Sequence, residues 1–401
     1  MLTLSQAQQL LDSTVQQAAP AKVEVRYAVG CKLSEDLSAP FDSPPFDNSA
    51  MDGIALDEAS LIGNPPWSLP LSETIEAGHT TDFRLPNGYA VKIMTGAPLP
   101  EGANSVIKVE ELEFHEGNVI ISTRPIPGNH IRPRGGDFRK GDILLQAGLT
   151  VKLVDVGVLA SIGKRKISVV PKPSVAILST GSEIVDAGSD LRPGQIYNIN
   201  EPALLALLES TNQIQATALP SVKDDIAQMT DILSSAITTH RVVITSGSVS
   251  MGDFDFIPHV ITELGGKIIF HKAKVKPGKP VIFAEFGDTD KRYLIGLPGN
   301  PVSVVVGYHL WVKRLIARLM GQSRNPETNF AKLSNDVKIK GARLNIIGVT
   351  IENKGDEVHA HPATRQISGH IGSISGIDGF MYVDPEEPMP VAGDMVKVEM
   401  M

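Results

Sequence analysis

The clearest pattern of hydrophobic and polar positions lies between residues 171 and 323, where short apolar runs alternate with amphipathic stretches. Strands are expected at 175–179, 214–219, 242–245, 267–270, 281–284 and 293–296, and helices at 202–210, 225–236, 256–264 and 301–320. Such alternation is typical of a parallel sheet with helices on both faces. We therefore predict a doubly wound α/β domain, with its ligand chemistry in the loops that follow the strands.

The flanking regions have a different pattern. Residues 39–150 contain short apolar stretches separated by Pro/Gly turns, which predicts a small β domain. Residues 331–401 again suggest short strands and turns, so we expect a small β barrel or sandwich at the end of the chain. The first residues predict an amphipathic helix, in which Ser5 and Gln8 form a capping-box pattern.

Composition narrows the class of protein. A chain of 401 residues with 42% hydrophobic side chains is too long for one core, so several domains are expected. The net charge of −8 lacks the basic field that nonspecific nucleic-acid binding needs. Cys31 is the only cysteine, which excludes intrachain disulfides, iron–sulfur clusters and cysteine-based zinc sites. With neither a secretion signal nor a membrane-length apolar run, we expect a cytoplasmic protein without nucleic-acid or membrane partners.

Three loops after predicted strands have the composition of phosphate-binding loops. In each, glycines permit close backbone approach, while hydroxyls and free N–H groups can hold phosphate oxygens. The alternatives are a tight turn for the first loop and a well-capped helix for the third. The candidate ligand-binding residues are Thr180, Gly181, Ser246, Gly247, Ser250, Pro298, Gly299, Asn300, Pro301 and Ser303.

A lysine-rich segment follows the strand expected at 267–270. Lys272, Lys274 and Lys276 alternate with small residues, so an extended chain would place all three ammonium groups on one face. A solvated edge strand protected by lysine explains Lys272 and Lys274 equally well. Because a Pro-Gly turn separates Lys276 from Lys279, these two cations are expected to converge, which suits a compact oxyanion.

Carboxylates near the same loops supply the opposite charge. Glu183 ends the first loop, Asp224 and Asp225 precede a helix, and Asp253 and Asp255 follow the second loop. A plain helix N-cap is the alternative for Asp224. If the carboxylates and the phosphate-binding loops converge, Mg²⁺ is the expected cation. His359 and His361 share a strand face but lack a third ligand, so we interpret them as surface or packing residues.

Three motifs in the N-terminal β region are too polar for strands. The densest, at 44–53, begins with a stiff Pro-Pro pair and contains Asp52; the others lie at 94–98 and 132–137. We interpret the first as a rigid functional loop.

Eight motifs in this order are specific as a set: FDNSAMDG, MTGAPLP, RPRGGD, LSTGSE, GQIYNIN, SGSVSMGD, KPGKP and LPGNP. On these motifs, which span most of the chain, the sequence resembles the molybdopterin molybdenumtransferase family (MoeA type), which includes the E domain of gephyrin.

The resemblance implies four domains. These are an elongated domain from 1–45 and 138–170, an inserted β-rich domain at 46–137, a molybdopterin-binding α/β domain at 171–323, and a C-terminal β barrel at 324–401. It also implies a homodimer whose cleft combines the α/β domain of one subunit with N-terminal loops of the other.

The implied reaction is the insertion of molybdenum from molybdate into adenylylated molybdopterin, with Mg²⁺-dependent release of AMP. Lys276 and Lys279 would hold molybdate; tungstate, a dianion of nearly equal size, fits the same description. Glu183, Asp225 and Asp255 would position Mg²⁺ or the phosphates. The positions that match family residues tied to activity are Asp52, Thr95, Asp137, Glu183, Asp225, Asp255, Lys272, Lys276, Lys279, Pro298 and Pro301, with Ser303, Arg343 and Ser368 on a thinner match.

This chain departs from the family pattern at three positions. Ser248 stands where glycine is usual and would crowd the approach to phosphate if that position needs a positive φ. Asn198 replaces a common Asp, and Ile54 a common Tyr. Two alternatives to the insertase remain open: a molybdopterin adenylyltransferase-like enzyme, and a noncatalytic cofactor carrier or scaffold. Possible protein partners are a molybdopterin adenylyltransferase and molybdoenzymes.

Overall fold

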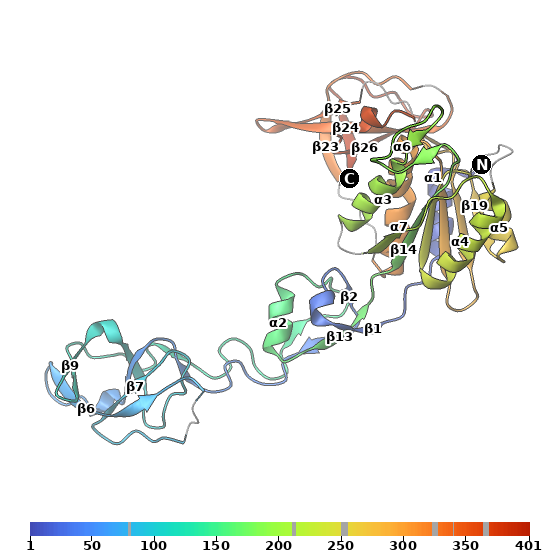
Figure 1. Ribbon diagram of the computed structural model, residues 1–401. Coiled ribbons are helices and arrows are strands. Elements are labelled where there is room, and N and C mark those ends of the chain that lie inside the picture. The colour runs from blue at the N-terminus through green and yellow to red at the C-terminus, as the bar shows by residue number, and fades with distance from the viewer. Residues whose placement is uncertain (79–81, 211–213, 250–255, 323–327, 340, 364–368) are drawn as a thin grey trace. The chain divides into compact units, whose positions relative to one another are not determined.

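The computed structural model describes residues 1–401 except 79–81, 211–213, 250–255, 323–327, 340 and 364–368 (Figure 1). The chain divides into two compact units. Unit 1 comprises Met1–Ser34, Gly148–Val156 and Arg165–Met401, and unit 2 comprises Glu35–Ala147 and Gly157–Lys164. The boundaries of the four predicted domains stay predictions.

Unit 1 is built on a six-stranded sheet in the order β17-β14-β18-β22-β21-β19. Its strands are β14 (Ser174–Ser179), β17 (Gln215–Ala218), β18 (Val242–Ser246), β19 (Lys267–His271), β21 (Ile282–Phe286) and β22 (Arg292–Leu297). The helices of this unit are α1 (Leu4–Thr14), α3 (Asn200–Glu209), α4 (Ile226–Thr239), α5 (Ile257–Glu263), α6 (Pro301–Gly307) and α7 (Lys313–Leu319), with a π turn at Tyr308–Val312 between α6 and α7.

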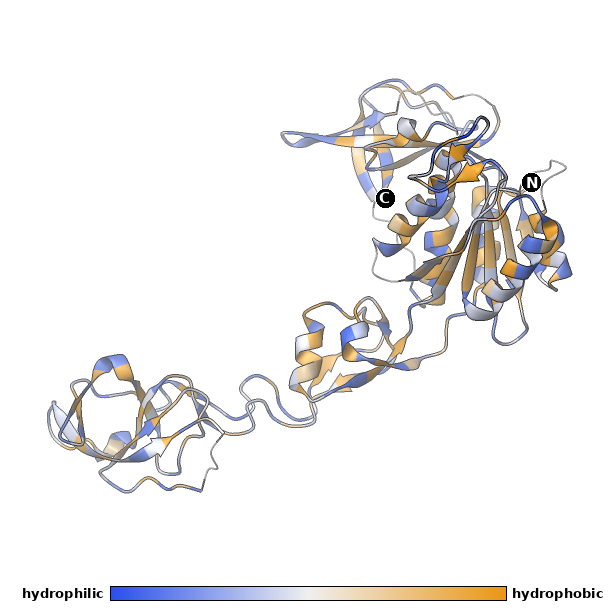
Figure 2. Cartoon of the chain, viewed as in Figure 1, coloured by the Kyte–Doolittle hydropathy of each residue, from blue (hydrophilic) through white to orange (hydrophobic). Residues whose placement is uncertain are grey.

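Helices cover both faces of this sheet, as predicted. Val175 and Ile177 of β14 pack with α3, α6 and α7, whereas Ala176 and Leu178 pack with α4 and α5. Successive strand residues point to opposite faces, so a continuous apolar run fits a strand that is buried on both sides. Figure 1 shows α3 and α7 on one side of the sheet and α4 and α5 on the other, and Figure 2 shows the strands between them as hydrophobic.

The prediction of an entirely parallel sheet was wrong at one edge. β17, β14, β18 and β22 are parallel, but β21 pairs antiparallel with both β22 and β19. Only residues 287–291 connect β21 to β22, and a parallel crossover needs a dozen or more residues.

The C-terminal strands close into a five-stranded barrel. They run in the order β24-β25-β23-β27-β26, and pairing of β24 with β26 completes the ring. The strands are β23 (Thr328–Leu333), β24 (Leu344–Lys354), β25 (Glu357–Pro362), β26 (Gly379–Val383) and β27 (Met395–Met400). The short strand β20 (Val275–Lys276) of the lysine-rich segment pairs with β24, which joins that segment to the barrel.

The N-terminal helix begins two residues earlier than the sequence pattern suggests. Thr3 is the N-cap of α1, and its capping-box partner is Gln6, so the predicted pair Ser5 and Gln8 was wrong. The helix buries Ala7 and Leu11 in the core that α7 shares. A cap two residues earlier satisfies the first backbone N–H groups of the helix equally well.

Unit 2 is all β around its main sheet, as the Pro/Gly spacing predicts. That sheet has the order β8-β5-β7-β6-β10-β9, with β5 (Gly53–Leu56), β6 (Trp67–Ile75), β7 (Ala90–Ile93), β8 (Ser105–Lys108), β9 (Leu112–His115) and β10 (Asn118–Ile121). Two further strand pairs belong to this unit: β3 (Leu37–Ser38) with β12 (Ile143–Leu145), and β4 (Asn48–Ser49) with β11 (Ile131–Arg132).

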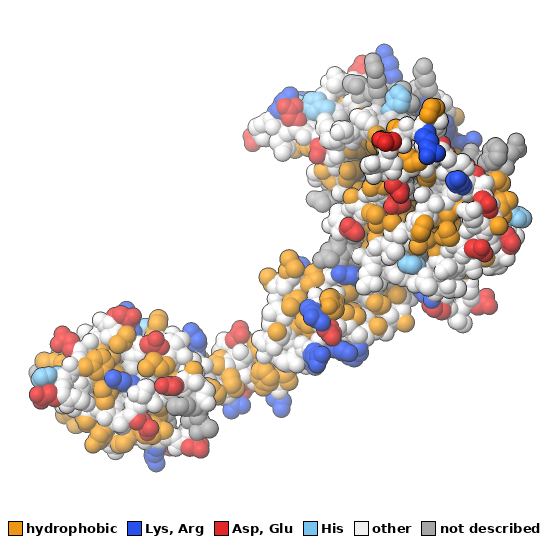
Figure 3. Space-filling view, viewed as in Figure 1, with side chains coloured by type: hydrophobic (Ala, Val, Ile, Leu, Met, Phe, Trp, Pro, Cys, Tyr) orange, Lys and Arg blue, Asp and Glu red, His pale blue; other side chains and the backbone are white. Residues whose placement is uncertain are grey.

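The remaining elements are short. They are β1 (Ala21–Glu24), β2 (Lys32–Leu33), β13 (Lys166–Val170), β15 (Ile184–Val185), β16 (Ile196–Tyr197), α2 (Asp155–Ser161), and single turns at Val25–Tyr27, Glu58–Ser60, Val109–Glu111 and Ile371–Ile374. Lysine, arginine and carboxylate side chains are interspersed over the visible face of unit 1 (Figure 3). No helix among the described residues is long and apolar enough to cross a membrane.

Candidate functional site

Two adjoining cavities lie in unit 1 beside the carboxyl ends of β14, β18 and β22. The larger has a volume of about 910 Å³ and the smaller about 310 Å³. They share Pro280, Pro298 and Asn300 as lining residues, so they form two compartments of one site. The larger compartment is lined by cationic side chains and the smaller by carboxylates.

Strand pairing positions the cations of the larger cavity. Lys276 of β20 lies opposite Asn345 of β24, and Lys279 follows in the next turn. Arg343, just before β24, donates from Nη1 to the Val275 carbonyl at 3.3 Å. Because β20 and β24 come from distant parts of the chain, the pairing brings Arg343 to the two lysines that converge across the Pro-Gly turn.

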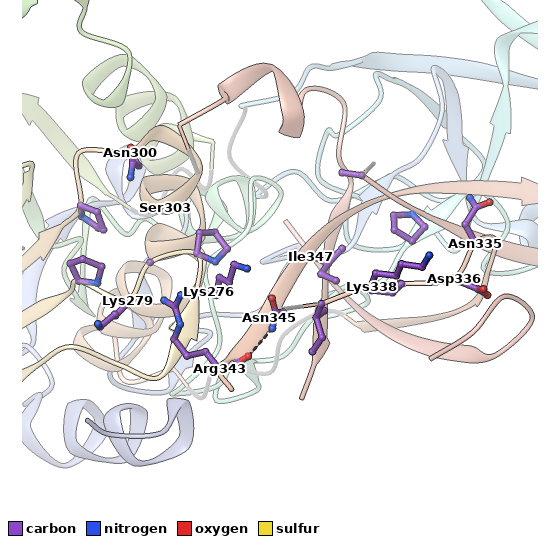
Figure 4. Close-up of a pocket in the computed structure, with 18 residues that line it drawn as sticks. Lys276, Lys279, Asn300, Ser303, Asn335, Asp336, Lys338, Arg343, Asn345 and Ile347 are labelled. Carbon is purple, nitrogen blue, oxygen red and sulfur yellow. Dashed lines mark hydrogen bonds between the residues drawn. The ribbon is translucent and has the colours of Figure 1, made fainter. Parts of the chain in front are cut away.

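The barrel supplies the opposite wall of the larger cavity. Asn335, Asp336 and Lys338 lie across from Lys276, Lys279 and Arg343, as Figure 4 shows. The lining of the larger cavity as a whole therefore carries four cationic side chains and one carboxylate, that of Asp336. Sequence reasoning missed Lys338 and Asn345, because no local pattern indicates that these residues face a segment more than sixty positions away.

The prediction that Lys272, Lys274 and Lys276 share one face of an extended segment was wrong. Lys272 has a left-handed backbone with φ 75°, so the chain is not extended there and the alternation of side chains breaks. Lys274 instead pairs with Glu386, with 3.3 Å between Nζ and Oε1. Lys272 and Lys274 line neither compartment. Among the described residues of this segment, the lysines that line the site are Lys276 and Lys279.

The smaller compartment contains Glu183 and Asp224. Asp224 accepts hydrogen bonds at Oδ2 from the backbone N–H and the hydroxyl of Ser182, at 3.1 and 3.2 Å. Its Oδ1 accepts from the Ser248 hydroxyl at 3.2 Å. Three donors therefore hold this carboxylate in one orientation at the edge of the pocket.

Glycine is required where β18 ends. Gly247 has φ 100°, and a Cβ there would lie 2.6 Å from both the carbonyl oxygen and the hydroxyl of Thr180. The loops after β14 and β18 therefore approach each other closely, and Thr180, Gly181 and Gly247 line the smaller compartment together. Ser246 lies beneath them, where its buried hydroxyl faces that of Ser179 at 3.3 Å.

The turn after β22 forms the boundary between the two compartments. Pro298 and Asn300 line both, and Gly299 lines the smaller one. The Gly299 carbonyl accepts from the Asn200 side-chain amide at 2.8 Å, which ties the turn to α3. Ser303 of α6 is buried and lines the larger cavity, whereas Pro301 is the first residue of α6 and, within the described chain, lines neither compartment.

Asp224 and Asp225 have the reverse of the roles that the sequence suggested, which were an N-cap for Asp224 and a ligand for Asp225. Asp225 is the N-cap of α4, where Oδ1 accepts from the Gln228 N–H at 3.1 Å, so the plain N-cap expected at Asp224 was wrong by one residue. Asp224 rather than Asp225 lines the compartment with Glu183. The capping geometry turns the Asp225 carboxylate back along its own helix.

A hard divalent cation fits this donor set. Glu183 and Asp224 offer carboxylate oxygens, and Mg²⁺ is usually held by one or two carboxylates together with substrate phosphates. Among the described residues, no group of three or more His, Cys, Asp or Glu side chains could hold a metal ion. His359 and His361 each face a glutamate, Glu357 at 3.1 Å and Glu352 at 2.8 Å, as surface pairs. The candidates Ser250, Asp255 and Ser368, together with Asp253, lie outside the described residues.

Unit 2 brings two other candidates together. Asp52 accepts hydrogen bonds at Oδ1 from the backbone N–H and the hydroxyl of Thr95, at 2.6 and 2.8 Å. These bonds, the backbone one first, hold the pKa of Asp52 below its ordinary value. Asp137 is exposed, and its backbone N–H donates to the Ser43 carbonyl.

A doubly wound α/β domain with a cationic cavity and a carboxylate pocket at its strand ends, joined to a closed barrel, defines a multidomain protein of the α/β class, whose ligands usually bind beyond the carboxyl ends of the strands. The chain matches three family models: "MoeA N-terminal region (domain I and II)" over residues 2–163, "Probable molybdopterin binding domain" over 176–318, and "MoeA C-terminal region (domain IV)" over 331–401.

Curated relatives agree with these matches. A molybdopterin molybdenumtransferase from Haemophilus influenzae is 34% identical over 327 residues, covering 80% of each chain. One from Nostoc sp. is 34% identical over 268 residues, covering 67% of this chain and 61% of that protein's length. The crystal structure of the molybdopterin biosynthesis MoeA protein from Pyrococcus horikoshii has a TM-score of 0.78 at 29% identity, covering 100% of this chain and 99% of that one. The chain belongs to the MoeA family of molybdopterin molybdenumtransferases.

Proposed function

We propose that this protein is a molybdenum insertase, which transfers molybdenum from molybdate to adenylylated molybdopterin with release of AMP. One observation carries the proposal: in a chain of this family, a cationic cavity and a carboxylate pocket adjoin at the strand ends of the α/β sheet. The reaction brings together a small dianion, which suits the cationic cavity, and a diphosphate-linked nucleotide, whose phosphates a cation held by the carboxylate pocket would neutralise.

Molybdate is assigned to the larger cavity. Lys276, Lys279 and Arg343 offer ammonium and guanidinium donors on one wall, and a tetrahedral dianion accepts hydrogen bonds in several directions. Ser303 adds a buried hydroxyl on the same side, beneath the turn that separates the compartments.

The smaller compartment is assigned to the phosphate linkage and Mg²⁺. Thr180, Gly181 and Gly247 form the floor on which a phosphate can approach the backbone. Glu183 and Asp224 would hold Mg²⁺, whose charge offsets that of the phosphates. Asp225 remains a structural cap in this proposal, although the family resemblance suggested it as a ligand.

The test incubates the protein with adenylylated molybdopterin, molybdate and Mg²⁺ and measures AMP by chromatography. Lys276→Ala and Asp224→Asn should each lower AMP release by at least about tenfold, because each removes a charge that contacts substrate or cation. Lys332→Ala, which removes an exposed lysine paired with Glu357, should leave the rate unchanged. Absence of AMP release, or undiminished release by Lys276→Ala, would rule the insertase out in favour of a carrier or scaffold.

We further propose a homodimer in which the Asp52, Thr95 and Asp137 loops of one subunit complete the site of the other. Asp52, Thr95 and Asp137 are exposed on unit 2, where a neighbouring subunit can reach them, and this exposure supports the arrangement. If Asp52→Ala and Lys276→Ala proteins are mixed and reassembled, about half of the dimers are mixed, each with one intact site. Activity should recover to about a quarter of the native value, whereas sites formed within one subunit would show no recovery.

We assign the reaction to the cytoplasm, which the single cysteine, buried and free, supports. The substrate must come from an enzyme that adenylylates molybdopterin, and the product must pass to molybdoenzymes. These are the two classes of protein partner that the proposal requires.

A further inference from the structure

Ser248 has a backbone conformation that is normally reserved for glycine. Its φ is 52°, and it follows Gly247 at the end of β18, where the chain turns over the smaller compartment. A left-handed backbone costs a serine of the order of 1 kcal/mol relative to glycine. Strain of this kind persists only where surrounding contacts hold the backbone in place, and the contacts of the Ser248 side chain are among these.

The Ser248 hydroxyl connects Thr180 to Asp224. Its Oγ lies 3.0 Å from the Thr180 hydroxyl and 3.2 Å from Oδ1 of Asp224. An ionised carboxylate only accepts, so Ser248 gives its single proton to Asp224 and accepts from Thr180. The alternative acceptor for Thr180, the Ser246 carbonyl, is farther away at 3.3 Å. The hydrogen bonds therefore run in one direction, toward the carboxylate.

The bonds on Asp224 leave a defined position for a cation. A carboxylate has about four acceptor positions, two on each oxygen. Ser182 occupies both positions on Oδ2, and Ser248 occupies one on Oδ1. Within the described part of the chain, one position on Oδ1 remains, so Asp224 is arranged to bind through a single oxygen.

We propose that Ser248 is a positioning residue that fixes Asp224 as a one-oxygen ligand and so favours Mg²⁺ over Ca²⁺ at this site. The inference rests on the Mg²⁺ site of the proposed function. Mg²⁺ requires near-octahedral geometry, whereas Ca²⁺ accepts irregular geometry and often uses both oxygens of a carboxylate. Without Ser248, Asp224 is held through Oδ2 alone, so its carboxylate can turn about its terminal torsion and offer both oxygens to the larger ion.

Two substitutions separate the hydroxyl from the backbone strain. Ser248→Ala and Ser248→Gly both remove the hydrogen bond to Asp224, but only Ser248→Gly also relieves the left-handed strain. We measure Mn²⁺ binding to the full-length protein by the EPR signal of the free ion, and displace it with Mg²⁺ or Ca²⁺. Both variants should bind Mg²⁺ roughly tenfold more weakly, a typical loss when the partner behind a metal ligand is removed, with a smaller loss for Ca²⁺.

Thermal unfolding of the same variants provides an independent measurement. Ser248→Gly should have a higher Tm than Ser248→Ala, although the two share the same Mg²⁺ defect. Ser210→Ala, which removes a hydroxyl that donates to the Leu207 carbonyl at the end of α3, is the control and should leave Mg²⁺ binding unchanged.

The opposing outcomes are distinct. If Ser248→Ala binds Mg²⁺ and Ca²⁺ as the native protein does, or if Ser248→Gly restores Mg²⁺ binding, the inference is overturned while the proposed function stands. If the native protein binds no Mn²⁺, or if Asp224→Asn leaves binding intact, both the cation site of the proposed function and this inference fail.

Discussion

Asp224 and Asp225 show how one position along the chain separates a structural role from a functional one. Asp225 has an extended backbone with φ −130° and ψ 113°, which lets its side chain cap the first turn of α4. Asp224 points instead toward Ser182 and Ser248 at the pocket. The identity of the two side chains is the same, so only the local backbone assigns the roles.

Substituting the two aspartates should have opposite consequences. Asp225→Ala should lower the free energy of unfolding of unit 1 by about 1 kcal/mol, because α4 loses its cap, and should retain Mn²⁺ binding. Asp224→Asn should lose Mn²⁺ binding with a smaller effect on stability. Urea unfolding and Mn²⁺ titration measure both; loss of Mn²⁺ binding in Asp225→Ala would return the ligand role to Asp225.

Glu201 makes stability depend on pH. Burial, above all, raises the pKa of this carboxyl group, while the hydrogen bond from Asn198 opposes the rise. The pKa of Glu201 is therefore higher in the folded protein than its unfolded-state value of about 4.3. The protein keeps its full stability while this carboxyl group is protonated, below the unfolded-state pKa, and loses part of it as pH rises through the folded-state pKa. Glu201→Gln should therefore raise the Tm at pH 7.5 by about 1 °C and have less effect at pH 4.5.

The control for this substitution is in the same helix. Glu209 is exposed at the end of α3, so Glu209→Gln should change the Tm equally little at both pH values. A gain for Glu201→Gln that is the same at pH 4.5 and pH 7.5 would contradict titration of Glu201 as its cause.

At the scale of elements, strand pairing determines which residues are tolerated. Gly53 begins β5 beside Asp52, and a Cβ there would lie 1.9 Å from the Ile107 carbonyl oxygen. β5 pairs with β7 on one side and with the edge strand β8 on the other, so the clash is with the backbone of a strand to which β5 is hydrogen-bonded. The glycine of the FDNSAMDG motif is therefore required by close packing of strands rather than by a turn.

Gly53→Ala should destabilise unit 2 by at least about 2 kcal/mol and speed amide exchange in β5 and β8. The matched control is Gly157→Ala in α2, where a Cβ meets open space. That substitution should stabilise the helix by up to about 1 kcal/mol. Equal stability of Gly53→Ala and the native protein would show that β5 and β8 separate more readily than their pairing suggests.

At the scale of the whole molecule, each unit has its own hydrophobic core. Trp311 is buried in the core of the α/β domain and Trp67 in that of unit 2, and these are the two tryptophans of the chain. Units with separate cores are expected to unfold as separate cooperative transitions.

Each tryptophan therefore reports on one unit. The fluorescence of Trp67→Phe should follow unit 1 and that of Trp311→Phe unit 2, with different urea midpoints. Adding Gly53→Ala should move only the midpoint reported by Trp67. Coincident midpoints that shift together would show that the two units unfold as one.

Much of the fold was predictable because burial leaves a local pattern. The apolar runs of β14, β18 and β22 and the amphipathic pattern of α4 identify these elements within two or three residues of their ends. The antiparallel edge at β21 was not predictable from its hydrophobicity, because a strand buried on both faces has the same composition in either direction. The capping box of α1 was misplaced for a similar reason, since Thr3 and Ser5 begin equivalent patterns.

The sequence by itself determined the chemistry that is available: glycine-containing loops after strands, converging lysines, carboxylates near them, and motifs that indicate the family. Tertiary structure decided which of these groups meet. The left-handed backbone at Lys272 and the pairing of Lys274 with Glu386 direct these two lysines elsewhere, pairing of β20 with β24 brings in Arg343, and the barrel adds Lys338. Residue type and spacing are local properties, whereas the direction of a side chain depends on backbone torsions and on partners far away in the chain.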